Sequence, residues 1–388
     1  MTKLKILHYS THNEDCGIAK YQEQFVAAMG LTSSKDVYNE FFSYSPNVTK
    51  IMSHDEFSVV LGQLKQKLQD FDILHIQHEL SFYKHDELGR IVDVGHELGK
   101  KVVFTVHTAP DAQYKTPERL GYGPRSMVGY AREIRAAREF ERIHIVPLQK
   151  ADLVIVHNTA IRDNLIKHGI NSGIIKVTIL PVPNVSFTET TDEIKKALNY
   201  QKDDVLVASV GFISETKGVK EAVKALAYLP DNYKLALIGG VHPSGGGEKY
   251  LDEVCDLIIE LGLRERTYIT GFVDDDIHLN ALIRECDVCI YPYDQKYYQY
   301  VSSAALNNSI ANHKPAIVYP TRPFVEMNQD GTIAICKSGN YYEMTRYIIE
   351  ADYSRLSSSS KLYAETYSYT NEAVKLVRIY EAILEKSN

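Results

Sequence analysis

The sequence has few cysteines, no excess of basic residues and no long apolar run, and each of these absences excludes a class of protein. It contains five cysteines, of which only Cys286 and Cys289 have the spacing of a metal-binding pair. Because no second pair accompanies them, we do not expect a zinc site, and the thiols are predicted to be reduced in the cytosol. The formal net charge of −7 argues against general nucleic-acid binding, which usually needs a basic domain.

Signals for membrane insertion and for two common nucleotide-binding motifs are also absent. No apolar run is long enough to span a bilayer, and residues 1–10 lead directly into an expected strand without the apolar core of a signal peptide. The glycine loop near the N-terminus lacks the GxGxxG pattern, and no Walker A sequence occurs. The sequence therefore argues against a dinucleotide-binding motif and against a P-loop. We therefore expect a cytoplasmic protein, with peripheral contact at the inner face of a membrane as an alternative.

Strands and amphipathic helices alternate along the whole chain. Its 388 residues, 44% hydrophobic and 24% charged, are enough for two folded domains with sizeable cores. The alternation predicts a mostly parallel sheet with helices on both faces in each half. We expect domains over residues 1–185 and 200–370, and a helix over 371–388 that closes the second domain or reaches back to the first. The expected strands span residues 4–8, 72–77, 102–107, 151–157, 177–180, 205–210, 234–238, 267–270, 288–291 and 316–318.

The stretch 207–230, VASVGFISETKGVKEAVKALAYLP, is the strongest candidate for an anion site. It reads as a buried strand ending at Gly211, a tight loop and an amphipathic helix. Lys217 and Gly218 lie at the start of that helix, where free amides and the positive helix end attract an anion and a lysine charge adds to them. The alternative is an ordinary strand–helix unit with a surface lysine. Gly17, just before the helix expected over 19–29, makes a second anion or sugar loop, or else a simple turn.

A third candidate lies in the tyrosine-rich stretch 290–320, and a fourth at a strand end in the first half. Ser302 and Ser303 stand at an expected helix start, where hydroxyls and free amides suit a phosphate, although either serine could be only an N-cap. Asn307 and Asn308 lie further along that helix and could reach a ribose or sugar hydroxyl. His107 ends an expected strand, the edge at which parallel sheets bind ligands, although a structural histidine is the alternative.

A basic segment interrupts the first half between residues 108 and 150. Arg132, Arg135, Arg138 and Arg142 recur at three- or four-residue steps, so they could share one helix face. Such a face could meet an anionic membrane surface or a phosphorylated acceptor. Because glutamates are interleaved with the arginines, a solvated helix with internal ion pairs explains the pattern as well, and we favour it.

Taken together, these stretches resemble the retaining GT-B glycosyltransferases of family 4, the "glycosyl transferases group 1" type. The resemblance is carried by TVH ending at His107, by ADLVIVHN, VGFISETKG, LALIGG, YITGFV and HKPAIVY, and by CDVCIYPY followed by the serine helix. It covers the whole chain and is closer in the second half. It implies an α/β GT-B fold, with two Rossmann-like doubly wound domains facing a central cleft. The first domain would bind the acceptor and the second a nucleotide-sugar donor.

The resemblance also implies roles for individual residues. Lys217 would contact the donor diphosphate, His107 the sugar at the reaction centre, and Ser302 and Ser303 the distal phosphate. No metal or other cofactor is implied, so the lysine and helix amides would neutralise the leaving diphosphate. The expected catalytic residues are therefore His107 and Lys217. The expected donor-binding residues are Gly17, Gly211, Lys217, Phe272, Val273, Asp294, Ser302, Ser303 and Asn308.

Two departures from the family pattern stand out. Phe212 occupies the position of an arginine that usually follows the glycine of the lysine loop. Tyr300 and Asn308 occupy the positions of two glutamates eight residues apart, and Asp294 is the candidate to substitute for the first. The sequence thus predicts a retaining, metal-independent glycosyltransferase acting on a glycan or lipid-linked acceptor, such as a bacterial surface polysaccharide. The alternatives are a related binding or scaffold protein without turnover, and a nucleotide-sugar isomerase of the same fold.

Overall fold

The protein folds into two α/β units, each built on its own parallel sheet. The computed structural model describes residues 4–14, 16–32, 37–109, 132, 134–242 and 245–385. One unit comprises Met1–Ile179 together with Tyr369–Asn388, and the other Leu180–Ser368. The expected two-domain α/β architecture is therefore confirmed. Of the basic segment, residues 110–131 and 133 lie outside the described residues, while Arg132, Arg135, Arg138 and Arg142 are exposed.

The first unit contains a six-stranded sheet in the order β2-β1-β3-β4-β5-β6, with every neighbouring pair parallel. Strand β3 is buried at every position and β4 at all but its first, as expected for strands covered on both faces. The strands are β1 (Leu4–Ser10), β2 (Val37–Ser43), β3 (Ile73–His78), β4 (Lys101–Val106), β5 (Leu153–Val156) and β6 (Ile175–Val177). The helices are α1 (Gly17–Thr32), α2 (Pro46–Thr49), α3 (His54–Leu68), α4 (Glu87–Glu97), α6 (Val146–Gln149), α7 (Thr159–Lys167) and α16 (Tyr369–Glu385).

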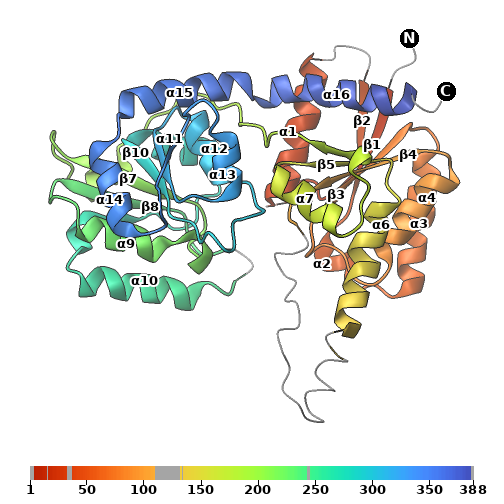
Figure 1. Ribbon diagram of the computed structural model, residues 1–388, viewed down its shortest axis with the longest axis horizontal. Coiled ribbons are helices and arrows are strands. Elements are labelled where there is room, and N and C mark those ends of the chain that lie inside the picture. Colours follow the sequence, from red (N-terminus) through yellow and green to blue (C-terminus); the bar gives the residue numbers. More distant parts are fainter. Residues whose placement is uncertain are drawn as a thin grey trace. The chain divides into compact units, whose positions relative to one another are not determined.

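The C-terminal helix α16 completes the first unit. It packs against α1, which it crosses in Figure 1. The ring of Tyr369 lies 5.0 Å from that of Phe25 and 6.1 Å from that of Tyr21. Tyr380, about three turns further along the same helix, is fully buried. The last helix of the chain is thus part of the core formed by the first strands.

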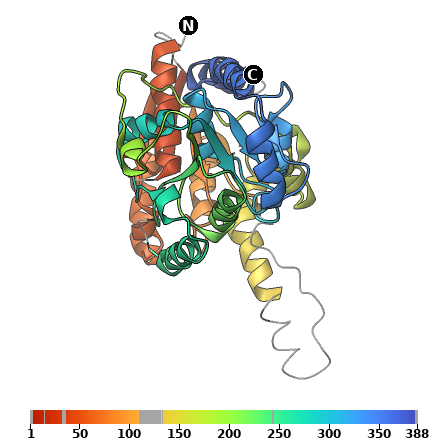
Figure 2. The same cartoon turned by 90° about the vertical axis from the view of Figure 1, so that its left-hand side faces the viewer.

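The second unit repeats the architecture, with the strand order β12-β11-β10-β7-β8-β9 and parallel pairing throughout. Helices flank the sheet (Figure 2). The strands are β7 (Val205–Val210), β8 (Tyr233–Ile238), β9 (Thr267–Ile269), β10 (Val288–Tyr291), β11 (Ala316–Val318) and β12 (Ala334–Ile335). The helices are α8 (Glu193–Ala197), α9 (Val219–Ala227), α10 (Glu248–Glu260), α11 (Asp276–Glu285), α12 (Ala304–Ala311), α13 (Arg322–Met327), α14 (Tyr341–Glu350) and α15 (Tyr353–Thr366).

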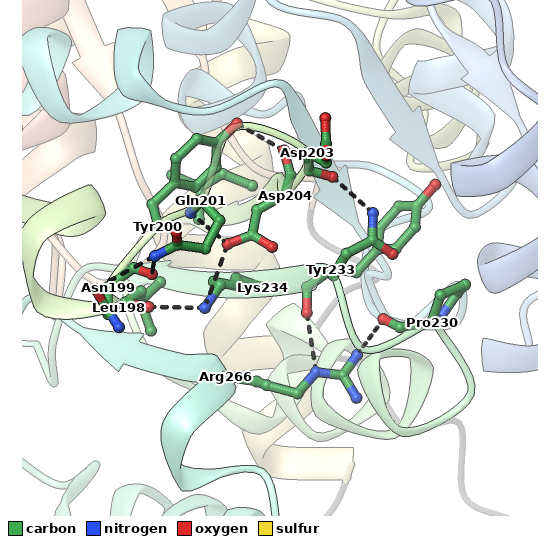
Figure 3. Close-up of polar contacts among 12 residues, drawn as sticks. Leu198, Asn199, Tyr200, Gln201, Asp203, Asp204, Pro230, Tyr233, Lys234 and Arg266 are labelled. Atoms are coloured by element: carbon green, nitrogen blue, oxygen red, sulfur yellow. Dashed lines mark hydrogen bonds and ion pairs between the residues drawn. The ribbon is translucent and has the colours of Figure 1, made fainter.

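Polar side chains hold the amino-terminal edge of this second sheet together (Figure 3). The guanidinium of Arg266 donates to the carbonyls of Tyr233 and Pro230 at 2.9 and 2.7 Å, and to two further carbonyls at and just beyond the end of α9. On the neighbouring turn, Lys234 pairs with Asp204 at 3.4 Å, and both side chains are largely buried. The bonds from Arg266 to the carbonyls at and just beyond the end of α9 satisfy groups that a helix end leaves without partners.

Each expected strand overlaps an observed one. The poorest match is the strand expected over 177–180, which shares only Val177 with β6 (Ile175–Val177). Several elements were not expected, among them the strands β2 and β12 and the helices α3, α13, α14 and α15. Helix α3 has a capping box in which Ser53 and Glu56 satisfy each other's backbone amides. Strands β2 and β12 lie at the outer edges of their sheets, where side chains are only partly buried.

Candidate functional site

The loops that follow β7, β8 and β9 pack backbone against backbone at the carboxyl end of the second sheet. Gly239 has φ +144°, and a Cβ there would overlap the carbonyl oxygen of Gly211. A Cβ on Gly240 would meet the amide of Phe272 at 2.5 Å. A Cβ on Gly211 would lie 3.5 Å from the Cβ of Ala305, at the start of α12. Glycines at these positions therefore bring three strand ends and one helix start into a single cluster.

Aromatic side chains cover part of this cluster. The rings of Phe212 and Phe272 are parallel to within 4°, with centroids 6.0 Å apart, and the ring of His242 lies 4.6 Å from that of Phe212. Phe212 and Phe272 remain 38% and 46% exposed, which is unusual for phenylalanine, and Val273 beside them is partly buried. The two rings thus form an exposed apolar face at the edge where parallel sheets bind ligands.

Lys217 lies in the turn before α9. Gly218, with φ +67°, follows it, and a Cβ there would overlap the carbonyl oxygen of Pro292. Lys217 Nζ donates to the hydroxyl of Tyr293 at 2.8 Å and lies over the rings of Tyr293 and Tyr298, 4.2 and 4.9 Å from their centroids. Burial lowers the pKa of Lys217, and Tyr298 partly offsets that shift.

The ammonium of Lys217 has no carboxylate partner among the described residues. Its neighbours are neutral phenols, because burial raises the pKa of Tyr293 and of Tyr298. A partly buried cation that faces only neutral groups loses hydration without gaining an opposite charge. An anion placed beside Nζ would supply that charge.

The serines and Asp294 lie around the same turn. The Ser303 hydroxyl is 3.0 Å from that of Tyr293 and accepts the amide of Leu306 at 3.1 Å, so Ser303 is the N-cap of α12. Ser302 precedes it and is partly buried. The amide of Asp294 donates to the carbonyl of Thr216 at 3.0 Å, which ties the loop after β10 to the lysine turn. The Asp294 carboxylate is exposed and accepts amides of its own loop.

The two asparagines of α12 differ in their surroundings. Asn307 is buried and donates to the carbonyls of Leu180 and Pro181 at 2.9 and 3.0 Å, so it holds the start of the second unit in place. Asn308 is partly buried, as is Tyr300 in the preceding loop. The second unit therefore brings Gly211, Lys217 and Ser303 into one cluster, with Asp294 beside the lysine turn.

In the first unit, His107 directly follows β4. Its Nε2 lies 2.8 Å from the side-chain oxygen of Gln77. Its ring meets the edge of Tyr21 at 4.9 Å and lies 5.6 Å from the ring of His157. Burial is the main cause that lowers the pKa of His107 well below the usual value, and His157 and His78 add to the shift. The imidazole is therefore neutral at physiological pH.

Gly17 begins α1 and is exposed, and nothing lies within 4 Å of a Cβ placed on it. Nothing in the described part of the structure therefore requires glycine there. The amide of Gly17 belongs to the first turn of a sixteen-residue helix, whose amides have no partners within the helix.

Sequence reasoning missed Tyr293, Tyr298 and Gln77, which contact the expected site residues directly. The phenols of Tyr293 and Tyr298 are 76 and 81 positions from Lys217 in the chain, and only the loop after β10 brings them together. Gln77 could have been noticed, since it is a polar residue inside the apolar stretch ILHIQH.

The described residues contain no group of three or more histidine, cysteine or acidic side chains placed to hold a metal ion. Asp275, in the acidic run at 274–276, caps α11 by accepting the amide of Ile277 at 2.9 Å. No described helix is both long enough and apolar enough to cross a bilayer.

Comparison with known proteins defines the class first. The solved structure of Anabaena HepE in complex with UDP is 14% identical in sequence, with a TM-score of 0.71 over 98% of this chain and all of that one. Sucrose-phosphate synthase from Thermosynechococcus elongatus is 15% identical, with a TM-score of 0.70 over 99% of this chain and all of that one. WaaG, a glycosyltransferase involved in lipopolysaccharide biosynthesis, is 14% identical, with a TM-score of 0.61 over 97% of this chain and 99% of that one. The fold is that of GT-B glycosyltransferases.

Two family models match the sequence itself. "Glycosyltransferase Family 4" matches residues 44–181, and "Glycosyl transferases group 1" matches residues 190–365. No curated protein sequence matches the chain. Together the two models cover most of the chain, and their matches and the fold identify a glycosyltransferase.

Proposed function

We propose that the protein transfers a sugar from a nucleotide diphosphate donor to a glycan or lipid-linked acceptor, with retention of configuration and without a metal ion. The second unit binds the donor and the first binds the acceptor. The observation that carries this proposal is the ammonium of Lys217, which faces only neutral phenols among the described residues. A diphosphate is an anion that such a cation stabilises, and its negative charge grows as the sugar leaves.

The surroundings of Lys217 support a diphosphate in particular. The start of α12 lies beside it through Tyr293 and Ser303, and helix amides and hydroxyls add to the stabilisation of an anion. Gly211 lets the neighbouring loop approach closely, and Phe272 and Val273 offer an apolar face for the base. HepE was solved with UDP and with UDP-glucose, so uridine nucleotides are the first probes to use.

Two further features are part of the proposal. Ser302 and the exposed amide of Gly17 bind phosphate oxygens, and Asp294 and Asn308 bind sugar or ribose hydroxyls. Since the solved WaaG belongs to lipopolysaccharide biosynthesis, a surface polysaccharide made at the cytoplasmic face of a membrane is the acceptor class that we favour.

A scaffold without turnover is the second candidate, and a specific observation favours it. Phe212, Tyr300 and Asn308 stand where the family usually has one arginine and two glutamates, so one cation and two carboxylates are missing. Lys217 and His107 are retained, and for that reason we place the enzyme first.

The deciding experiment compares wild type with His107→Ala. We expect wild type to release UDP from UDP-glucose, or from another nucleotide sugar in a panel, and His107→Ala to lose turnover while its dissociation constant for UDP stays unchanged. A contact made chiefly in the transition state lowers the rate without changing ground-state affinity. Binding of UDP without turnover of any donor, in wild type as well, would establish the scaffold. Equal rates in both proteins would make His107 structural.

A further inference from the structure

A continuous chain of side-chain hydrogen bonds links His107 to the edge strand β2 of the first sheet. His107 Nε2 lies 2.8 Å from Gln77 Oε1, and Gln77 Nε2 donates to Gln22 Oε1 at 2.5 Å. Gln22 Nε2 lies 2.8 Å from His8 Nδ1, and His8 Nε2 lies 2.8 Å from Asn39 Oδ1. The chain crosses β4, β3, β1 and β2 in their order in the sheet, with Gln22 contributed by α1.

The sheet register places these groups on one face. His8 on β1 pairs with His75 on β3, and Gln77, two residues on, pairs with Thr105 on β4. Alternate residues of a strand point to the same side, so His8, His75, Gln77 and Thr105 share the face that α1 covers. All four are at most 1% exposed, as is Gln22. Buried polar groups are costly unless they are paired, and here each has a partner.

The direction of each bond follows from the chemistry of the atoms. An amide oxygen only accepts, so the Oε1 of Gln77 requires a proton on Nε2 of His107. The amide nitrogen of Gln22 donates, so Nδ1 of His8 is unprotonated and its Nε2–H donates to Asn39. All these hydrogen bonds can therefore form when His107 and His8 are both neutral and both carry their proton on Nε2.

A branch fixes Gln77 from the other side. Its amide nitrogen is also 3.3 Å from Nε2 of His75, whose ring is held by Thr105 and by the hydroxyl of Tyr380, each at 2.8 Å. Tyr380 belongs to α16, so the C-terminal helix contributes to the same network. With its nitrogen occupied by Gln22 and His75, the amide of Gln77 presents its oxygen to His107.

We propose that Gln77 is a positioning residue that holds His107 as the Nε2–H tautomer, so that Nδ1 accepts a hydrogen bond from a hydroxyl of the bound sugar. The second half of this statement rests on the proposed function, and the first half does not. His107 is partly exposed, and its Nδ1 has no hydrogen-bond partner among the described residues. His107 therefore orients the sugar as an acceptor and does not act as a proton donor at Nδ1.

The groups that face His107 come from four elements. They are Gln77 and His78 on β3, Tyr21 on α1, His157 after β5, and Glu79, which accepts the hydroxyl of Thr108 at 2.8 Å. Burial raises the pKa of Glu79 and lowers that of His157 to about 4. Replacing Gln77 by glutamate would put a carboxylate against Nε2–H, which stabilises the imidazolium and raises the pKa of His107.

The first test uses the full chain labelled with ¹⁵N-histidine and needs no substrate. Two-bond ¹H–¹⁵N spectra report the tautomer of each of the 14 histidines, and His107 is assigned by its absence in His107→Gln. We expect a single Nε2–H form in wild type, a mixture of tautomers in Gln77→Leu, and a raised pKa in Gln77→Glu. An Nδ1–H form in wild type, or an unchanged His107 signal in Gln77→Leu, would overturn the proposal.

Tyr83→Phe is the matched control. It removes a hydroxyl that donates to the backbone carbonyl of Gln77 at 2.7 Å, and it leaves the side-chain amide intact. We expect it to lower thermal stability without changing the tautomer of His107. If Gln77→Leu does not fold, the wild-type spectrum and the near-isosteric Gln77→Glu still decide the question.

The second test measures turnover of UDP-glucose, or of the donor identified in the panel. We expect Gln77→Leu to lower kcat about tenfold, the equivalent of one hydrogen bond, with KM within twofold of wild type. Gln77→Glu should regain activity as the pH rises and its histidine loses the added proton. If Gln77→Leu keeps the kcat of wild type, Gln77 does not contribute to turnover through His107. Absence of turnover in wild type contradicts the proposed function alone, because the tautomer is read without substrate.

Discussion

Removing the charge of Lys217 should weaken the binding of UDP far more than it weakens the fold. Lys217 Nζ is held by one hydroxyl and two aromatic faces, and no described carboxylate balances it. A hydrogen bond to a charged group is worth about 1.5–3 kcal/mol. At 1.4 kcal/mol for each factor of ten, Lys217→Met should raise the dissociation constant of UDP by about 10- to 150-fold.

Stability and binding are separable at this position. The lowered pKa of Lys217 means that the folded state disfavours the ammonium. This penalty is present at neutral pH and disappears as the pH rises through the lowered pKa toward the usual value. Methionine is an unbranched side chain only one atom shorter than lysine, and it removes the penalty, although it also loses the bond to Tyr293. We therefore expect the free energy of unfolding of Lys217→Met to differ from that of wild type by no more than about 1 kcal/mol.

The assay is isothermal titration calorimetry with UDP on wild type, Lys217→Met and Lys224→Ala. Lys224 lies further along α9 and pairs with Glu221 at 2.9 Å, so its loss removes a nearby positive charge without touching the lysine turn. Lys224→Ala should bind UDP as wild type does. Equal affinity for UDP in Lys217→Met and wild type would show that Lys217 is not part of the donor site. An equal loss of affinity in Lys217→Met and Lys224→Ala would show that Lys217 acts only through its positive charge and not through direct contact.

The remaining predictions concern metal and stability. If the diphosphate is neutralised by Lys217 and helix amides, turnover should survive excess EDTA, and complete loss that magnesium or manganese restores would refute metal independence. Arg266→Ala should lower the free energy of unfolding by about 2–3 kcal/mol, because four carbonyls lose a charged donor, whereas the exposed Arg264→Ala should change it little. Arg266→Lys should not restore stability, since an ammonium cannot reproduce the planar fork, and full rescue in urea unfolding would count against this account.

The parts of the fold that were predicted are those encoded locally. Strand β7, the lysine turn and α9 follow one another within 24 residues, and their apolar spacing marks each of them. The capping box of α3 is also local, since Ser53 and Glu56 are only three residues apart. Strand β12 has only two residues, too few to show any periodicity.

The contacts of the candidate site could not be predicted in the same way. Gln77 meets Gln22 across 55 positions and His107 across 30, and only the strand order β2-β1-β3-β4 makes them neighbours. Polar residues at alternate positions of otherwise apolar strands, as in His75 and Gln77, were the available signal. Such residues indicate a buried polar network, although not which groups pair within it.

The departure at Phe212 bears on the proposed donor site. An arginine at that position would add a second cation to the loop after β7, whereas the phenylalanine ring stacks parallel to Phe272 and near His242. The site therefore gains an apolar surface and loses a charge. Stacking on an aromatic face favours a planar base, and in the proposed site Lys217 and the amides at the start of α12 would have to neutralise the diphosphate without a second cation. For this reason Lys217 should matter more here than in a site where an arginine shares the charge, and the calorimetric loss should fall toward the upper end of its range.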